Sequence, residues 1–468
     1  MSILVTLPYF HGLLPREEIG ELLVKTGDFI LRFTEPSSDG VKLPVLSIRT
    51  DHGLHHVMFV KSKDYPGKYE LGTMIDTVPN IIEFYLEKGC KMFNRDVSIK
   101  RAIGRQSWEF MMEDVEILKP LGQGAFGEVR LGKLRLPDGK KIDVAVKLAM
   151  SQTLNKDQIR EYMNEARIMR RLNHPHVVRY HGVCVLKEPL MIIMELAEDG
   201  ALENLIKKAN GSISIEKKME MCLQAAWGLE YLHDYSIIHR DIAARNCLYG
   251  DGKVKLSDFG LARYGTYYKL TNKKKQPIRW LAPEAFSGHF YTKSDVYSFG
   301  VLCWEIFTDC AVEPYRGLTV VEIIKLVKSG ERLELPSTVP SSYAEVIKNH
   351  CWTHDVHERW TISEVVSHWY PILYPEEAKI KKPMKGKPSK PQKISPSPSN
   401  VEGSQPSSDL PSEKRKKKHK RPNMSQQSDS DDFKKQGEAN NPQKEMLRNF
   451  ARNRARCLRK SRKSEKDK

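Results

Sequence analysis

The feature that most constrains the fold of this chain is a glycine-rich segment between two strand-like runs. Gly122, Gly124 and Gly127 lie within LGQGAFGEV (121–129), which overlaps the end of VEILKPL and leads into VRLGKL. Dinucleotide-binding folds also hold phosphates with spaced glycines, but in those folds a helix follows the glycines. Because a strand pattern follows them here, the segment predicts a β-hairpin whose backbone lies over the phosphates of a nucleotide.

A strand and a helix further along the chain supply a lysine and a carboxylate for it. In DVAVKLA, the alternation of a strand puts Ala145 and Lys147 on one face. The following run, KDQIREYMNEARIMRRL, has apolar residues at helical spacing and contains Glu165. A lysine in a strand is usually an exposed edge charge. Here Glu165 offers a partner that would hold Lys147 towards a phosphate.

Three further motifs follow in the chain: IHRDIAARN, KLSDFGLAR and APE. Together with the glycine segment and the strand lysine, they resemble the protein kinase family over residues 114–372. The resemblance implies that Asp241 accepts the proton of the substrate hydroxyl, and that Asn246 and Asp258 hold the metal ions. The cofactors implied are ATP and Mg²⁺, with Mn²⁺ as an alternative ion. His239 is interpreted as structural, and Arg240 as free to pair with a phosphate on the activation loop.

The kinase resemblance also assigns an adenine site, with Met194 as gatekeeper and Glu195 to Ala197 as the hinge. The residues expected to bind ATP are Leu121, Gly122, Gln123, Gly124, Ala125, Phe126, Gly127, Glu128, Val129, Ala145, Lys147, Met194, Glu195, Ala197 and Leu248.

Two motifs indicate which hydroxyl is phosphorylated. After Asp241, the chain has Ala243 where serine/threonine kinases usually have lysine, and Arg245 follows. This resembles the tyrosine kinases, and so does QPIRWLAPE, whose Pro277 and Trp280 would support a tyrosine ring. Asp241, Arg245, Lys147 and Glu165 are therefore the expected catalytic set of a protein tyrosine kinase.

The segment between Asp258 and Glu284 contains three tyrosines. Tyr267 lies at the spacing before Trp280 at which Fes/Fer kinases carry an activating phosphotyrosine, and Tyr268 is the second candidate. A phosphate there would add nearly two negative charges close to Arg240, which can order the loop.

Residues 1–98 carry short strand-like runs between two helical patterns, PREEIGELLVK and TVPNIIEFYLEKG. With YFHGLLPREE and FILR, they resemble a Src-homology-2 (SH2) domain. Arg32 would then bind the phosphate of phosphotyrosine through its planar guanidinium, with Arg16, Thr34 and His56 at the other pocket positions. An SH2 domain before a tyrosine kinase resembles the Fes/Fer non-receptor kinases. We expect a short form that begins at the first strand of this domain and lacks their membrane-curving region.

The basic character of the chain belongs to its end. Residues 373–468 hold 27 Lys and Arg against 12 Asp and Glu, so they carry most of the net charge of +17. They are rich in Lys, Ser and Pro and include KRKKKHKR, which predicts disorder. The eight cysteines form no CxxC pair, and no signal peptide is recognisable. These features favour reduced thiols in the cytosol or nucleus.

The expected fold class is α+β. An SH2 domain (1–98), with an antiparallel sheet flanked by two helices, is followed by a linker (99–113), a bilobal kinase (114–372) and a disordered basic tail (373–468). The expected partners are tyrosine-containing substrates and phosphotyrosine proteins, with no base-specific nucleic-acid binding. The protein would be cytoplasmic, with the tail directing it to anionic membranes or the nucleus. Two alternatives stay open: a catalytically dead adaptor, and a chain whose main function lies in the tail.

Overall fold

The computed structural model describes residues 2–34, 41–89, 97–124, 127–149, 154–270 and 276–380. The chain divides into two units, residues 1–381 and 382–468, and all of the described residues lie in the first. Nearly all of the predicted tail therefore lies outside the described residues. Within them, no helix is both long and apolar enough to cross a membrane.

The N-terminal domain is built on a four-stranded sheet in the order β3-β2-β1-β7. The strands β1 (Asp28–Thr34), β2 (Leu43–Thr50) and β3 (Gly53–Met58) are antiparallel, and β7 (Arg101–Ala102) runs parallel to β1. A smaller sheet contains β4 (Val60–Lys61), β5 (Tyr69–Leu71) and β6 (Met74–Asp76). Its helices are α1 (Ser2–Val5), α2 (Arg16–Leu22) and α3 (Val78–Lys88). The sequence predicted that the chain begins at the first strand of this domain. This prediction is wrong, because α1 and α2 precede β1.

Helix α3 shows how the sequence sets the ends of an element. The Thr77 side chain accepts a hydrogen bond from the Asn80 amide, and Pro79 occupies the first turn. Both are favoured at a helix start, where backbone N–H groups lack partners. The helix ends at Gly89, whose φ of 54° is left-handed and suits glycine.

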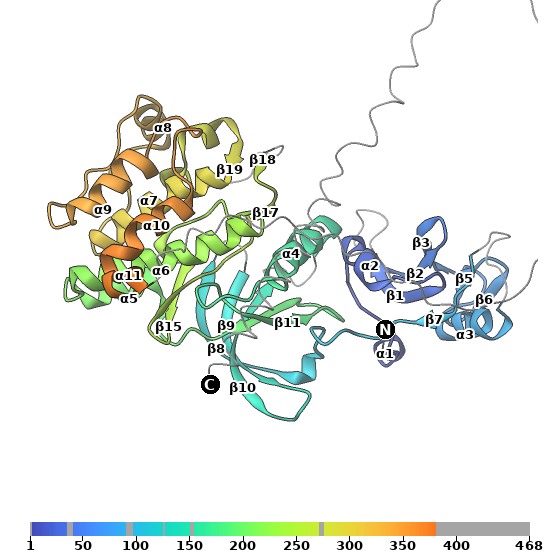
Figure 1. The fold of residues 1–468 in the computed structure, drawn as a ribbon. Coiled ribbons are helices and arrows are strands. Elements are labelled where there is room, and N and C mark those ends of the chain that lie inside the picture. The colour runs from blue at the N-terminus through green and yellow to red at the C-terminus, as the bar shows by residue number, and fades with distance from the viewer. Residues whose placement is uncertain are drawn as a thin grey trace, which may run out of the picture. The chain divides into compact units, whose positions relative to one another are not determined.

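The next lobe is a five-stranded antiparallel sheet in the order β11-β12-β10-β9-β8 (Figure 1). A short 3₁₀ turn, η1 (Met112–Asp114), leads into it. Its strands are β8 (Val115–Gly124), β9 (Gly127–Arg135), β10 (Lys141–Ala149), β11 (Tyr180–Cys184) and β12 (Met191–Glu195). Helix α4 (Lys156–Met169) begins at an Asn155 cap and buries the apolar face that the sequence predicted. A separate apolar cluster, which includes Val144 and Ile193, fills another side of this sheet.

The following lobe is mainly helical. Its α-helices up to residue 373 are α5 (Leu202–Ala209), α6 (Ile215–Asp234), α7 (Thr292–Phe307), α8 (Val320–Lys328), α9 (Ser341–Val346) and α10 (Ile362–Leu373). The short strands are β13 (Gly200–Ala201), β14 (Ile237–Ile238), β15 (Cys247–Gly250), β16 (Lys253–Leu256), β17 (Arg263–Tyr264), β18 (Tyr267–Lys269) and β19 (His289–Tyr291). Single turns are η2 (Ala244–Asn246), η3 (Ile278–Trp280), η4 (Pro283–Ser287) and the π-helical η5 (Ile347–Cys351). Helix α7 is buried over most of its length, so it forms the centre of this lobe.

The folded region continues past residue 372, where the tail was expected to begin. Helix α11 (Pro375–Ile380) follows α10, and the Tyr374 ring stacks on Trp227 of α6 with centroids 6.2 Å apart. The expected boundary was too early because this aromatic packing joins residues that are far apart in the sequence.

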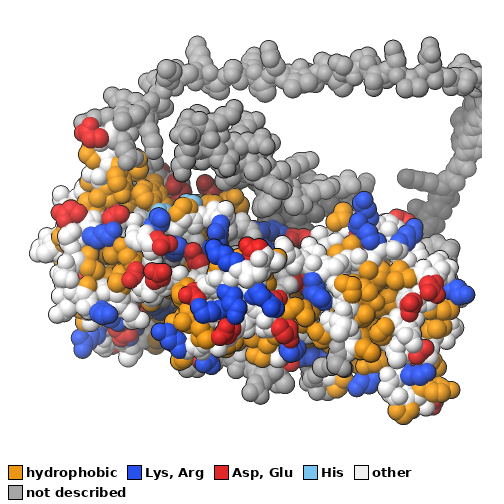
Figure 2. Space-filling view, turned by 90° about the horizontal axis from the view of Figure 1, so that it is seen from below, with side chains coloured by type: hydrophobic (Ala, Val, Ile, Leu, Met, Phe, Trp, Pro, Cys, Tyr) orange, Lys and Arg blue, Asp and Glu red, His pale blue; other side chains and the backbone are white. Residues whose placement is uncertain are grey.

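The surface of the described residues agrees with a net charge that lies mainly in residues 373–468. On the face shown in Figure 2, Lys and Arg side chains alternate with Asp and Glu instead of forming one patch.

Candidate active site

Lys147 on β10, Glu165 on α4 and Asp258 after β16 come together. Lys147 Nζ donates to Glu165 Oε1 at 2.8 Å and to Asp258 Oδ1 at 3.2 Å. Burial by itself would lower the pKa of Lys147, but the two carboxylates more than offset it, so the pKa is raised. Lys147 therefore stays charged, as contact with a phosphate requires.

The glycine segment forms the predicted hairpin. Gly124 of β8 pairs with Gly127 of β9, and a Cβ on Gly127 would lie 2.1 Å from the Leu148 carbonyl oxygen. No larger residue fits there without moving β10. Ala125 and Phe126 lie outside the described residues, and so does the side chain of Gln123.

The other predicted ATP residues lie on adjoining strands. Ala145 on β10 is paired with Met194 on β12, and Leu248 lies on β15. The Glu195 carboxylate accepts hydrogen bonds from the Arg179 amide (2.8 Å) and Lys255 Nζ (2.9 Å), which fixes the start of the hinge. The remaining members are Leu121, which is half exposed, Gly122, Glu128, Val129 and the buried Ala197.

In the catalytic loop, Asp241 contacts Arg245 and Asn246, which follow it in the sequence. Arg245 Nη2 pairs with Asp241 Oδ1, and Asn246 Nδ2 donates to the Asp241 carbonyl at 2.8 Å. Burial raises the pKa of Asp241, and Arg245 opposes that shift. Because Asn246 uses its Nδ2, its amide oxygen is the group that can ligate a cation. With the Asp258 carboxylate, it fits Mg²⁺, which proteins commonly bind through one or two carboxylates plus substrate phosphates.

Asp295 of α7 binds the backbone of this loop. The sequence analysis did not identify this residue. Its carboxylate accepts hydrogen bonds from the His239 amide (2.7 Å) and the Arg240 amide (2.8 Å). His239 has the structural role that was expected, since its ring lies against Phe259 and its Nε2 lies 3.0 Å from the Ser257 carbonyl. Asp295 stands in SDVYSFG, 54 residues after Asp241, so only the fold brings it here.

Arg240, which is expected to pair with a phosphate on the activation loop, already has other contacts in this structure. It donates to the Leu261 carbonyl (3.0 Å) and to Gln276 Oε1 (3.2 Å). Its guanidinium also lies over the rings of Tyr268 (4.7 Å) and Phe290 (4.3 Å). The unphosphorylated loop already engages this arginine through cation–π contacts.

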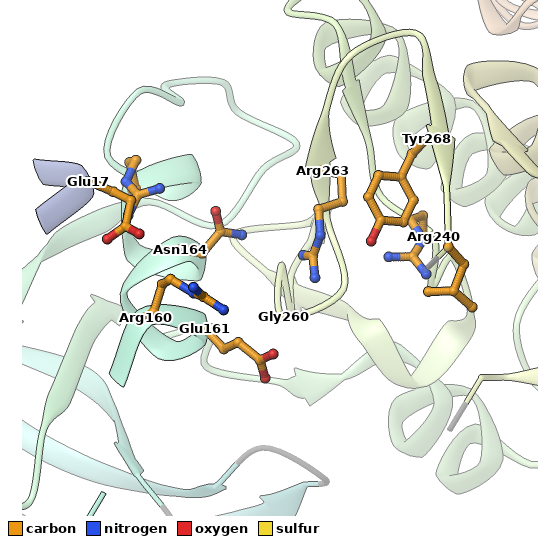
Figure 3. A pocket seen from close by; sticks show the side chains of 10 residues that line it. Glu17, Arg160, Glu161, Asn164, Arg240, Gly260, Arg263 and Tyr268 are labelled. Carbon is orange, nitrogen blue, oxygen red and sulfur yellow. The ribbon is translucent and has the colours of Figure 1, made fainter. Parts of the chain in front are cut away.

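The two candidate phosphorylation sites face different surroundings. Tyr267 is 45% exposed, and its hydroxyl lies 2.9 Å from His289 Nδ1. Tyr268 lies beside Arg240 and Arg263 at one wall of a pocket of about 250 Å³, with Arg160 and Glu161 of α4 across from it (Figure 3). The neighbouring residues Lys273 to Lys275 lie outside the described residues.

The N-terminal domain contains a second candidate site around Arg32. This side chain is 3% exposed, and its Nε donates to Ser47 Oγ at 3.0 Å. His56 Nδ1 lies 2.9 Å from the same hydroxyl, and Arg16 begins α2 close by. Thr34 ends β1, next to residues that are not described. The sequence analysis did not single out Ser47.

The charges around Arg32 favour an anion. Burial, followed by the neighbouring Arg16, lowers the pKa of Arg32 to about 10. Burial, followed by Arg32, lowers the pKa of His56 to about 4. Within the described residues, Arg32 forms no salt bridge with a carboxylate, although a buried charge is costly without one.

Helix α2 of the N-terminal domain contacts α4, the helix that carries Glu165. The buried Glu18 carboxylate accepts from Arg167 Nε (2.6 Å) and Arg170 Nη2 (2.9 Å). Close by, the Arg170 guanidinium stacks over Trp108 at 4.2 Å. Gly12 approaches β11 so closely that a Cβ would lie 2.2 Å from the Val185 carbonyl oxygen. The N-terminal domain is thus attached to the helix that positions Lys147.

A glycine hairpin over a strand lysine, a carboxylate on α4 and a loop carrying Asp241 and Asn246 define a protein kinase. The family model for protein tyrosine and serine/threonine kinases matches residues 115–369. Over 366 residues, the chain is 35% identical to Fer-related kinase 1 of Caenorhabditis elegans. The matched region covers 76% of this chain and 91% of that protein. It is 34% identical over 363 residues to tyrosine-protein kinase Fer of Homo sapiens, and this match covers 76% of the chain and 43% of human Fer.

A third relative is the tyrosine-protein kinase transforming protein Fps of Fujinami sarcoma virus. It is 35% identical over 357 residues, 75% of this chain and 40% of the viral protein. The chain therefore spans less than half the length of Fps and of human Fer. It belongs to the protein kinase family, among the Fes/Fer-related tyrosine kinases. Its reaction transfers the γ-phosphate of ATP to tyrosine residues of proteins.

Proposed function

We propose that this chain is a non-receptor tyrosine kinase whose N-terminal domain is an SH2 domain that binds phosphotyrosine proteins. The observation that carries the proposal is Arg32: a buried guanidinium without a carboxylate salt bridge among the described residues, oriented by Ser47. A phosphate is the anion that a planar guanidinium binds best, through two parallel hydrogen bonds. Binding would direct the kinase to substrates that are already phosphorylated nearby.

In the kinase domain, Asp241 accepts the proton of the tyrosine hydroxyl, and Lys147 neutralises phosphate charge. Asn246 and Asp258 would hold Mg²⁺, which offsets the charge that develops on the transferred phosphate. The transition state is loose, so the residues act mainly by positioning and electrostatics. Glu165 keeps Lys147 in place at 2.8 Å.

We further propose that the SH2 domain regulates the kinase through α4. Glu18 links Arg167 and Arg170, and Glu165 lies on the same helix. A docked SH2 domain would stabilise the position of α4 in which Glu165 reaches Lys147.

For the activation loop, spacing favours Tyr267 as the phosphorylation site and geometry favours Tyr268. A phosphate on Tyr268 would enter the pocket that Arg160, Arg167, Arg240 and Arg263 line, where Arg167 Nη2 is buried without a hydrogen bond among the described residues. This phosphate would join the loop to α4, and the SH2 contacts lie on the same helix.

The basic tail lies outside the described residues apart from its first eight. We propose that it contributes to localisation, through anionic membranes or nuclear import, in an otherwise cytoplasmic protein. Comparing the cellular distribution of the full chain with that of residues 1–380 tests this, and an unchanged distribution would contradict it.

The experiment that tests the SH2 proposal is isothermal titration of the full chain with a phosphotyrosine peptide. Arg32→Ala should weaken binding by about 2 kcal/mol or more, because it removes a charge-assisted bidentate contact. Arg32→Lys should recover little of it, since an ammonium cannot bind two oxygens in the same way. Lys88→Ala removes a positive charge at an exposed site of the same domain and serves as the control. Equal affinity in Arg32→Ala and Lys88→Ala would exclude this pocket.

A further inference from the structure

Glu305 lies near the end of α7 and reaches two separate parts of the active site. Its side chain is buried, and its Oε2 accepts hydrogen bonds from the Ala244 amide (2.9 Å) and from Trp280 Nε1 (3.0 Å). Ala244 begins the η2 turn of the catalytic loop, whereas Trp280 ends η3 beyond the activation loop. One carboxylate oxygen therefore joins two segments that no strand or helix connects.

Both segments converge on Asp241. The Arg245 guanidinium lies over the Trp280 ring at 4.0 Å, and its Nη2 pairs with Asp241 Oδ1. Arg245 also directly follows Ala244 in the chain. The backbone and the ring that determine where Arg245 lies are thus both held by Glu305.

Burial of an ionised carboxylate at Glu305 is energetically unfavourable. Burial raises the pKa of Glu305 to about 7, although the hydrogen bonds from Trp280 and Ala244 and the charge of Arg245 act against it. The other ionisable groups that interact with it are Glu203 and Lys207 on α5 and the uncharged thiols of Cys247 and Cys310. A group shifted this far beside catalytic residues is a candidate for a functional role, because a neutral acceptor would avoid the cost of burying a charge.

We propose that Glu305 is a positioning residue for phosphoryl transfer to tyrosine. It holds Ala244 and Trp280 together, so that Arg245 stays against Asp241 where the acceptor ring must enter. In this role Glu305 acts through Ala244 and Trp280. Misplacement of the acceptor by a fraction of an ångström is enough to slow a reaction that depends on alignment.

Steady-state kinetics with a tyrosine peptide test the proposal. Glu305→Ala should lower kcat/KM for the peptide roughly 10- to 100-fold, the loss expected for charge-assisted hydrogen bonds, and should leave the KM for ATP nearly unchanged. Glu305→Gln keeps an acceptor oxygen without the charge, so its loss should be smaller. The exposed Glu345→Gln on α9 controls for removal of a carboxylate and should match the wild type.

The pH profile separates positioning from mere support of the fold. The ionised carboxylate binds both donors more strongly than its protonated form, so wild-type activity should exceed that of Glu305→Gln most above pH 7. The ratio of their kcat/KM values should fall towards one as the pH drops through about 7, where Glu305 takes up a proton. A ratio that is constant across this range would overturn the proposal.

A double-mutant cycle with Trp280→Phe locates the effect. Phenylalanine keeps a ring beneath Arg245 but removes the Nε1 donor, so Glu305→Gln should cost less in that background. Thermal unfolding and ATP titration show whether each variant is folded. If Glu305→Ala does not fold, the Glu305→Gln variant and the double-mutant cycle still test the proposal. Additive effects of the two substitutions, or equal losses in the KM for ATP and for the peptide, would contradict the proposal.

Discussion

At the scale of single residues, the active site depends on charges that are buried together. Lys147, Glu165 and Asp258 share hydrogen bonds of 2.8 to 3.2 Å, and Asp241 is held by Arg245 and Asn246. Removing one member leaves its partner without compensation, whereas an isosteric change removes only the charge.

Asp241→Asn is such a change. We expect phosphate transfer to fall by several orders of magnitude, because an amide cannot accept the tyrosine proton. ATP binding should stay close to the wild type, because Lys147 and Asp258 remain. Peptide phosphorylation and nucleotide titration measure the two effects separately, and a variant that keeps more than about a tenth of the activity would exclude Asp241 as the base.

The wild-type pH profile adds to this test. Since burial raises the pKa of Asp241, activity should be full at a pH above that raised value and be lost as Asp241 takes up a proton at lower pH.

At the scale of elements, the activation loop is held without phosphate. Strands β18 and β19 pair Tyr267 with Tyr291 and Tyr268 with Phe290. The Tyr268 ring also lies over Arg240, and the Tyr267 hydroxyl meets His289. This loop can therefore support basal activity, and a phosphate would strengthen an arrangement that already exists.

Substitution of each tyrosine by phenylalanine distinguishes the two sites. Tyr268→Phe keeps the ring over Arg240, so basal activity should persist while stimulation by autophosphorylation is lost. Tyr267→Phe removes the hydroxyl near His289 and should lower the basal rate about twofold to threefold, as expected for one partly exposed hydrogen bond. Mass spectrometry with rates before and after incubation with ATP provides both readouts. Full stimulation in the double variant would show that this loop is not the switch.

At the scale of the whole molecule, the folded unit joins its N-terminal domain to the kinase through Glu18, Arg167 and Arg170. Two arginines on one buried carboxylate make an orientation-dependent contact. Glu165 lies on the same helix as Arg167, and this arrangement is the basis of the proposed regulation.

Glu18→Arg should therefore lower kcat for a peptide roughly fivefold or more, since coupling between sites is typically about 1 to 3 kcal/mol. Combining it with Arg167→Glu should restore part of the loss, because opposite charges face each other again. Glu87→Arg on the exposed part of α3 is the control. Wild-type kcat in a folded Glu18→Arg protein would show that the contact does not regulate the kinase.

The sequence by itself determined which chemistry the chain carries. Glycines between two strands, a lysine on the next strand and the HRD, DFG and APE motifs are local patterns, and so are the helix caps at Thr77 and Asn155. The glutamate of APE, Glu284, pairs with the buried Arg359 at 2.8 Å.

Only the tertiary structure decided the rest. It showed that Asp295 accepts hydrogen bonds from the catalytic loop, Ser47 contacts Arg32, Glu18 joins Arg167 and Arg170 at the end of α4, and Glu305 accepts a hydrogen bond from Trp280. Each is an ordinary polar residue in its own segment, and its partners lie 15 to 152 residues away. Their roles depend on burial and on distances of about 3 Å between distant segments, which local sequence patterns do not specify.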